Sequence, residues 1–152
     1  MIPDLTPEGL LPPGIHETTL VEVRRRFGRQ NAARRRIMKG LEEVAREALA
    51  AGALDLYVDG SFATSKKEPG DWDGILIVPL AGFSTGSKQV RFFTDLPALK
   101  KNFHADLFML YEDDNEVIDH YLKDVFARDR EKRPKGILRL RLKGGDHGTD
   151  QE

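Results

Sequence analysis

The chain has 152 residues, with 24 lysines and arginines against 25 aspartates and glutamates, which gives a formal net charge of −1. This length suits one domain with its own core, and the charge argues against a protein that wraps nucleic acid over its whole surface. The absence of cysteine excludes disulfides, thiolate metal sites and cysteine nucleophiles. No apolar run approaches the ~20 residues that cross a bilayer, and no signal peptide is evident, so we expect a soluble, cytoplasmic protein without a membrane partner.

The first half of the chain predicts a lead-in, two helices and a strand. Residues 1–16 hold four prolines and two glycines, which predicts an irregular lead-in to a domain spanning 17–143. Apolar residues at helical spacing predict helices over 19–27, with a capping box at its start, and over 31–51, each ended by a glycine. The strand-forming segment 54–59 follows.

The second half alternates strands and helices. An almost wholly apolar stretch, 74–79, predicts a strand covered on both faces. A loop over 81–95, a short helix at 96–101, a strand at 103–111, a helix at 116–128, a strand at 137–142 and a frayed tail at 144–152 come next. In the helix, Ile118, Leu122 and Val125 form the expected apolar face. The alternation predicts a single domain of the α/β or α+β class.

The pattern with chemical content is a glycine-serine turn followed by two aspartates. Strand 54–59 ends in Gly60-Ser61, and nine residues later Asp71-Trp72-Asp73 opens the apolar strand. Side chains alternate along a strand, so Asp71 and Asp73 point to one face, roughly 7 Å apart along it. Two such carboxylates can bind Mg²⁺ ions that clamp an in-line phosphoryl or nucleotidyl transfer. If a helix begins at Ser61, its free N–H groups could bind a triphosphate, and Gly60 lets phosphate approach the backbone.

A third acid, Asp106, stands alone in an apolar strand pattern. Burying a carboxylate is costly unless it is paired or bound to metal, so Asp106 is a candidate third ligand or proton acceptor. His104, two residues earlier, would share its face. Trp72 points away from its flanking aspartates and is expected in the core.

The Gly60-Ser61 turn, the Asp71-x-Asp73 pair and the later Asp106 resemble the signature of the DNA polymerase beta-like nucleotidyltransferase superfamily. The wider sequence also resembles a family of small uncharacterised bacterial proteins assigned to it. The resemblance implies a mixed sheet flanked by helices, and transfer of a nucleoside monophosphate from an NTP such as ATP to an acceptor. It implies Mg²⁺, or Mn²⁺, at the three aspartates as catalytic metal ligands, and nucleotide binding by the turn.

Two features depart from that signature. Gly74 follows the second aspartate where the superfamily has a bulky apolar residue, and the chain lacks an added helical domain for the acceptor. They motivate an alternative, a catalytically silent module that binds a nucleotide or a partner. The resemblance suggests such a role in toxin–antitoxin or defence pairs, with a HEPN-type toxin as the protein partner.

Each candidate also has a plainer interpretation. The aspartate pair could be a solvated turn, Asp106 an acid at a strand edge, and Ser61 an N-cap. Lys66 and Lys67, between the two halves of the motif, could reach phosphate or simply be solvated. Eight cations and no acid lie between Arg24 and Lys39. This run could bind nucleic acid, but solvated faces of two amphipathic helices are the favoured interpretation.

Overall fold

In the computed structural model, which describes residues 1–82 and 92–142, one mixed sheet carries the fold. The strands lie in the order β1 (Ile15–Thr18), β5 (Ile137–Arg141), β2 (Asp55–Asp59), β3 (Trp72–Val78) and β4 (Ala105–Tyr111). The β1–β5 and β3–β4 pairs are parallel, and β2 is antiparallel to both of its neighbours. The predicted α+β domain with a mixed sheet flanked by helices is confirmed.

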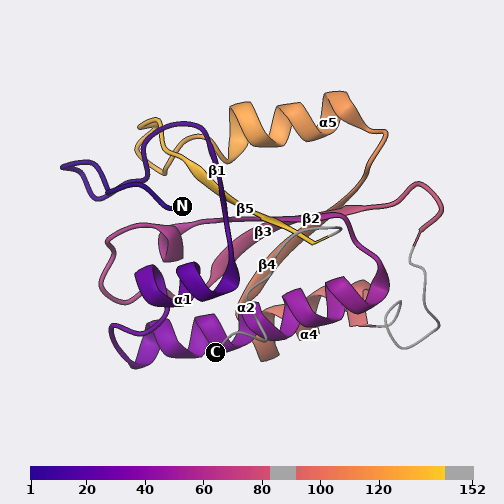
Figure 1. Ribbon diagram of the computed structural model, residues 1–152, viewed down its shortest axis with the longest axis horizontal. Coiled ribbons are helices and arrows are strands. Elements are labelled where there is room, and N and C mark those ends of the chain that lie inside the picture. The colour runs from indigo at the N-terminus through magenta and orange to yellow at the C-terminus, as the bar shows by residue number, and fades with distance from the viewer. Residues whose placement is uncertain (83–91, 143–152) are drawn as a thin grey trace.

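Helices cover the two faces of the sheet unequally (Figure 1). The larger core lies under α1 (Leu20–Phe27), α2 (Ala32–Ala51) and α4 (Leu96–Phe103). Among the described residues, the helix on the opposite face is α5 (Asn115–His120), continued by a π-helical turn, Tyr121–Val125. None of the helices in these described segments is long and apolar enough to span a membrane. The face under α5 is therefore the more open one, and the candidate site lies on it.

The helix ends follow the capping residues of the sequence. The Thr19 hydroxyl accepts the Glu22 amide at the start of α1, and the Asn31 side chain accepts the Arg34 amide at the start of α2. Gly52 ends α2 with φ +86°, a left-handed conformation that suits glycine. The predicted helices at 19–27, 31–51 and 96–101 are confirmed to within about two residues, the usual uncertainty of helix ends.

The predicted lead-in is wrong in its last residues, because Ile15–Thr18 forms edge strand β1. Ile15 and Glu17 are exposed on this strand, so its sequence lacks the apolar alternation of a half-buried strand. The preceding segment is irregular but packed, with Leu11 fully buried and Ile2 and Leu10 nearly so. The lead-in therefore belongs to the domain's core.

The last helix also differs from its prediction. Its α-helical part ends at His120, and the next turn closes with the Phe126 amide donating to the Tyr121 carbonyl at 2.8 Å. A π turn holds one residue more than an α turn, which moves the apolar face along by one position. Phe126 is therefore buried in the place expected for Val125, which is 43% exposed.

Two predictions fall outside the described residues in whole or in part. Most of the predicted loop at 81–95 lies in 83–91, and the predicted tail at 144–152 lies beyond residue 142. Trp72 confirms its predicted core position: it is fully buried, and its indole N–H donates to the Phe103 carbonyl at 3.1 Å. A Cβ added to Gly74 would lie 2.6 Å from the Trp72 ring, so the tryptophan fills the space that a larger residue at 74 would need.

One arginine of the basic run is a structural cation. The Arg34 side chain is 4% exposed and donates to the carbonyls of Phe27, Phe62 and Thr64 at 2.7–3.0 Å, and also to that of Lys66. These carbonyls come from the end of α1 and from the segment after β2. Arg34 thus fixes that segment, which leads toward the site, against the start of α2.

We expect Arg34→Met to destabilise the fold by about 2–4 kcal/mol, because four carbonyls lose a charged donor. Arg35→Met is the matched control, since Arg35 is exposed on the same helix, and its effect should stay within about 0.5 kcal/mol. Urea denaturation measures both free energies of unfolding. Equal midpoints for the two variants would contradict the structural role of Arg34.

Candidate functional site

Three aspartates lie side by side across the open face of the sheet. Asp59 on β2 is paired in register with Asp73 on β3, and Asp73 is paired with Asp106 on β4. Paired residues on neighbouring strands point to the same face, with Cβ atoms about 4.5–5.5 Å apart in antiparallel pairs. Like charges in this arrangement repel each other, so the three acids, called here the acid row, need compensation from the surrounding residues.

Lys100 of α4 compensates one end of the row. Its Nζ atom lies 3.2 Å from Asp71 Oδ2 and 3.9 Å from Asp106 Oδ2. Asp71, two residues before Asp73, therefore reaches the same cation as Asp106. The hydrogen bond and the charge of Asp71, with the charge of Asp106, raise the pKa of Lys100, although this ammonium is mostly exposed.

Asp73, in the middle of the row, is an acid whose ionised form the site disfavours. Burial, followed by the charges of Asp71 and Asp106, raises its pKa from 3.8 to about 6, against a smaller opposing effect of Lys100 and Arg130. Repulsion between neighbouring carboxylates in a cleft is a recurrent property of functional sites, although structural networks produce it as well.

A buried ion pair that the sequence analysis did not predict compensates the other end of the row. Lys135 Nζ donates to Asp59 Oδ1, and both residues are buried, at 5% and 3% exposure. Burial lowers the pKa of Lys135 to about 8, which leaves the ammonium charged at neutral pH. The two residues are 76 positions apart, so no local pattern in the sequence indicates the pair.

The glycine-serine turn faces the acid row, as predicted. Gly60 has φ +86°, and a Cβ added there would lie 2.7 Å from Asp73 Oδ2. A side chain at position 60 would therefore strain the backbone and clash with the carboxylate. The helix that would bind a triphosphate if it began at Ser61 is only a single 3-10 turn, Ser61–Ala63, closed by the Ala63 amide donating to the Gly60 carbonyl.

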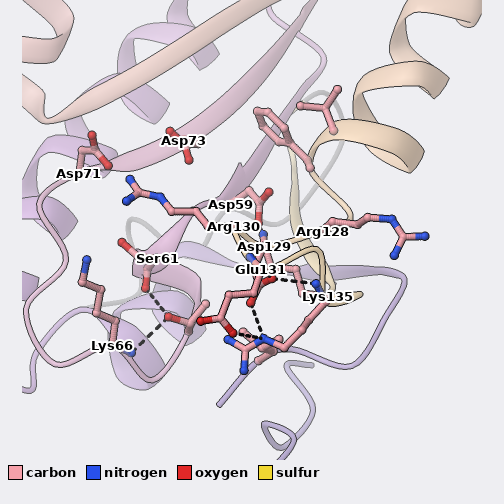
Figure 2. A pocket seen from close by; sticks show the side chains of 16 residues that line it. Asp59, Ser61, Lys66, Asp71, Asp73, Arg128, Asp129, Arg130, Glu131 and Lys135 are labelled. Carbon is pink, nitrogen blue, oxygen red and sulfur yellow. Dashed lines mark hydrogen bonds and ion pairs between the residues drawn. The ribbon is translucent and has the colours of Figure 1, made fainter. Parts of the chain in front are cut away.

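A cavity of about 400 Å³ lies beside the row, between the turn and the segment that leads into β5 (Figure 2). This volume is within the range of small-molecule sites. Its lining combines predicted and unpredicted residues: Leu10, Asp59, Gly60, Ser61, Thr64, Lys66, Asp71, Asp73, Val125, Phe126, Arg128, Asp129, Arg130, Glu131, Arg133 and Lys135. Lys67 lines a second cavity instead, and Asp106 lines neither.

The wall opposite the aspartates is a charged loop, 128–133, that the sequence analysis did not single out. Asp129 organises this loop by accepting the amides of Glu131 and Arg133 on Oδ1 and the Arg133 guanidinium on Oδ2 at 2.7 Å. Figure 2 shows the Arg130 side chain extending toward Asp71 and Asp73, in agreement with its effect on the pKa of Asp73. The alternating charges of 128–133 were the available signal, but such a run is more often solvated.

Two expectations about Asp106 and its neighbour are wrong. The Asp106 side chain is 51% exposed because β4 is an edge strand, so its burial costs little, and the plainer interpretation of an edge acid fits its position. His104 precedes the strand as the left-handed C-cap of α4, with φ +56°, and so does not share a strand face with Asp106. The electrostatic coupling of Asp106 to Asp73 and Lys100 still places it at the site.

Within residues 1–82 and 92–142, no three Asp, Glu or His side chains are grouped so that they could hold a metal ion as they stand. Two of the candidate ligands, Asp71 and Asp106, both contact the Lys100 ammonium. The arrangement is therefore a cluster of carboxylates already neutralised in part by protein cations.

Comparison with known families adds one finding. The model of a family of unknown function, DUF6932, matches residues 3–141. The chain belongs to that family. The match extends from the lead-in through β5, so the DUF6932 unit contains all five strands, the acid row and the charged loop. No curated protein and no solved structure matches the chain.

The buried pair predicts a strong double-mutant effect. Lys135→Met leaves the Asp59 charge buried without its partner and should destabilise the fold by about 3–5 kcal/mol. Adding Asp59→Asn should restore most of this loss, because the buried charge is then gone. Chemical denaturation of the single and double variants measures the coupling. Additive losses would show that the two residues act independently.

The raised pKa of Asp73 predicts that this residue costs stability. The folded state binds the Asp73 proton more tightly than the unfolded chain, so stability falls as the pH rises from about 3.8 through about 6. Asp73→Asn should therefore stabilise the protein at pH 7 by about 1–2 kcal/mol after allowance for screening, or by about 3–6 °C in Tm.

That gain should shrink as the pH falls through about 6 and disappear below about 3.8, where Asp73 is protonated in both states. Asp4→Asn is the control, since Asp4 is an exposed aspartate of the lead-in outside the acid row. Calorimetric melting at the two pH values makes the comparison. A loss of stability in Asp73→Asn at pH 7 would contradict the electrostatic account.

Proposed function

We propose that this protein is a Mg²⁺-dependent nucleotidyltransferase that moves a nucleoside monophosphate from an NTP to an acceptor hydroxyl. The observation that supports the proposal is that the charges of Asp71 and Asp106 act on Asp73 beside the Gly60-Ser61 turn, with Asp71 and Asp73 lining the cavity. The sequence pattern of the superfamily requires these residue types in this order. Asp73 and Asp106 are paired on neighbouring strands, and Asp71 shares the Lys100 ammonium with Asp106.

The donor chemistry of the three candidate ligands, Asp71, Asp73 and Asp106, suits Mg²⁺. All three are carboxylates, the donors that Mg²⁺ prefers together with substrate phosphates. Burial, followed by the charges of Asp71 and Asp106, raises the pKa of Asp73, and a bound cation would relieve the repulsion between these carboxylates. Asp71, Asp73 and Asp106 would hold the ion, with Lys100 displaced from its present contacts. When bound, Mg²⁺ supplies neutralisation of the charge on the reacting phosphate oxygens.

In the proposed transfer, a carboxylate of this chain accepts the proton that the acceptor hydroxyl loses. The acceptor hydroxyl oxygen attacks the α-phosphorus of the NTP, a new P–O bond forms, and the bond from that phosphorus to the α–β bridging oxygen breaks. Pyrophosphate leaves. The hydroxyl proton passes to the carboxylate of Asp106, whose exposure on the edge strand leaves it open to an incoming acceptor.

Cationic groups on both sides of the cavity suit the phosphates of the nucleotide. Ser61 and Lys66 line one side, and Arg130 extends from the charged loop on the other (Figure 2). Among the described residues, neither Lys66 nor Arg130 forms an ion pair within 4 Å, whereas Arg133 and Lys135 are engaged with Asp129 and Asp59. The donors of Lys66 and Arg130 are therefore available to an anion.

A second candidate function rests on Lys100. Its ammonium bridges Asp71 and Asp106, so a protein cation already takes the place between two of the proposed metal ligands. This arrangement favours a module that binds a nucleotide or a protein partner without turnover, as in a toxin–antitoxin or defence pair with a HEPN-type toxin. Lys100→Ala distinguishes the two functions: it should strengthen Mg²⁺ binding in an enzyme and leave a metal-independent module unchanged.

Calorimetric titration with ATP and Mg²⁺ tests the proposal. Wild-type protein should bind the pair, and Asp71→Asn/Asp73→Asn should weaken binding at least about tenfold, a loss of about 1.4 kcal/mol, because two metal ligands are lost. Asp4→Asn should bind like the wild type. Transfer of an α-phosphate label from ATP to protein or RNA in a lysate then separates enzyme from silent module. Equal affinity of the wild type and the double variant for ATP with Mg²⁺ would overturn the assignment of Asp71 and Asp73 to the site.

A further inference from the structure

The basic run 24–39 contains some cations that stabilise the fold and others that are exposed. Arg24 pairs with Glu42 at 2.7 Å, Arg26 donates to the carbonyls of Ile2 and Pro3, and Arg34 is the buried cation of the fold. The others are exposed: Arg25, Arg29, Arg35, Arg36 and Lys39. Three arginines of the run therefore stabilise the fold, and the other five cations form a positively charged surface.

The basic run contains no acid in its own sequence that could balance its charge. No acid lies between residues 24 and 39, and the acids that flank the run are engaged elsewhere. Glu42 contacts Arg24, Glu43 contacts Arg46, and Glu22 accepts the Ile2 amide. The chain as a whole has a net charge of −1, so the positive surface reflects a separation of charge within the molecule.

A second cavity, of about 310 Å³, lies between the α1–α2 turn, where Arg29 is found, and the segment after β2. It is lined by Gln30 and Asn31 at the turn between α1 and α2 and by Ser65, Lys66 and Lys67 after β2. Lys66 also lines the first cavity, so the two cavities meet at this residue. A cationic path thus runs from the α1–α2 turn past Lys66 to the aspartates.

Two contacts hold the sides of this path together. The Asn31 side chain donates to the Lys67 carbonyl at 2.6 Å, and the Arg34 guanidinium donates to the Thr64 and Lys66 carbonyls. The segment after β2 therefore lies beside the start of α2 (Figure 1). On the helix side, Arg35 donates to the Arg29 carbonyl at 3.5 Å, which draws its guanidinium toward the same turn. The cations are presented by ordered backbone, which lowers the entropy cost of binding an anion.

We propose that this path, called here the basic track, binds the phosphodiester backbone of a single-stranded nucleic acid whose terminal hydroxyl is the acceptor. This inference rests on the proposed nucleotidyl transfer and names its acceptor class. Arg29, Arg35, Arg36 and Lys67 contact backbone phosphates, and Lys66 binds phosphate where the track enters the first cavity.

The chemistry of the track favours a nucleic acid strand over other polyanions. Arginine binds phosphate oxygens in a bidentate manner, and a nucleic acid strand carries a hydroxyl at its end, which the proposed reaction requires. Inorganic polyphosphate has no such hydroxyl. A duplex is too stiff to bend into a cavity of this size, since its persistence length is about 50 nm. Phe27, the aromatic residue of the second cavity, is buried, so we expect little base stacking and little sequence preference.

Fluorescence anisotropy with a short labelled RNA of mixed sequence tests the inference. Wild-type protein should bind it, and Arg29→Gln/Arg35→Gln/Arg36→Gln should weaken binding at least about tenfold. Loss of three phosphate contacts should also reduce the slope of log affinity against log salt by about 2. Arg46→Gln is the matched control: this arginine is exposed on the same helix but paired with Glu43, and the variant should bind like the wild type.

The same assay separates this inference from the proposed reaction. Asp73→Asn should lose transfer and keep RNA binding, whereas the triple variant should keep binding of ATP with Mg²⁺. An absence of RNA binding by wild-type protein, or equal affinity in the triple variant, overturns the basic track even if transfer occurs. Binding of a poly-glutamate peptide as tight as that of RNA overturns the nucleic acid assignment in favour of an acidic protein partner. Tighter binding of a duplex than of the single strand overturns the single-strand assignment.

Discussion

Repulsion between three aligned carboxylates is the constraint around which this fold is arranged. The pairing of β2 with β3 and of β3 with β4 brings Asp59, Asp73 and Asp106 into one row, and no change of side-chain rotamer can move them to different faces. The protein places Lys135 at one end and Lys100 at the other. Asp73 in the middle has no cation of its own within ion-pair distance among the described residues. Burial, followed by the charges of Asp71 and Asp106, raises its pKa.

The two faces of the sheet serve different purposes because they are covered to different extents. The face under α1, α2 and α4 holds the large core and, through Trp72 and Gly74, a closely packed strand β3. The other face is covered only in part by α5 and its π turn, which leaves the acid row beside a cavity. The sharp division lies within β3 itself, where Trp72 points into the core and Asp71 and Asp73 point to the cavity.

The features that could be predicted from the sequence are those that depend on residues close together in the chain. Caps at Thr19 and Asn31, a left-handed Gly52 and the alternation around Asp73 depend on a few neighbouring residues, and they fixed the helices, the central strands and the turn. Three features depended on distant residues and were missed. The Lys135–Asp59 pair joins residues 76 positions apart, Asp106 is exposed because β4 is the last strand of the sheet, and β1 is held by a strand that follows it by more than a hundred positions.

The position of β5 has a consequence for how the protein is made. This strand is the final element of the described chain, yet it lies between β1 and β2, and Lys135 arrives with it. During synthesis from the N-terminus, β1 and β2 are made before β5, the strand that lies between them, and Asp59 is made before its counter-ion, Lys135. The ribosome must therefore have released nearly the whole domain before the sheet closes. Termination after Asp59 but upstream of residue 135 leaves the facing edges of β1 and β2 unpaired and Asp59 without Lys135, which exposes the incomplete chain to proteolysis.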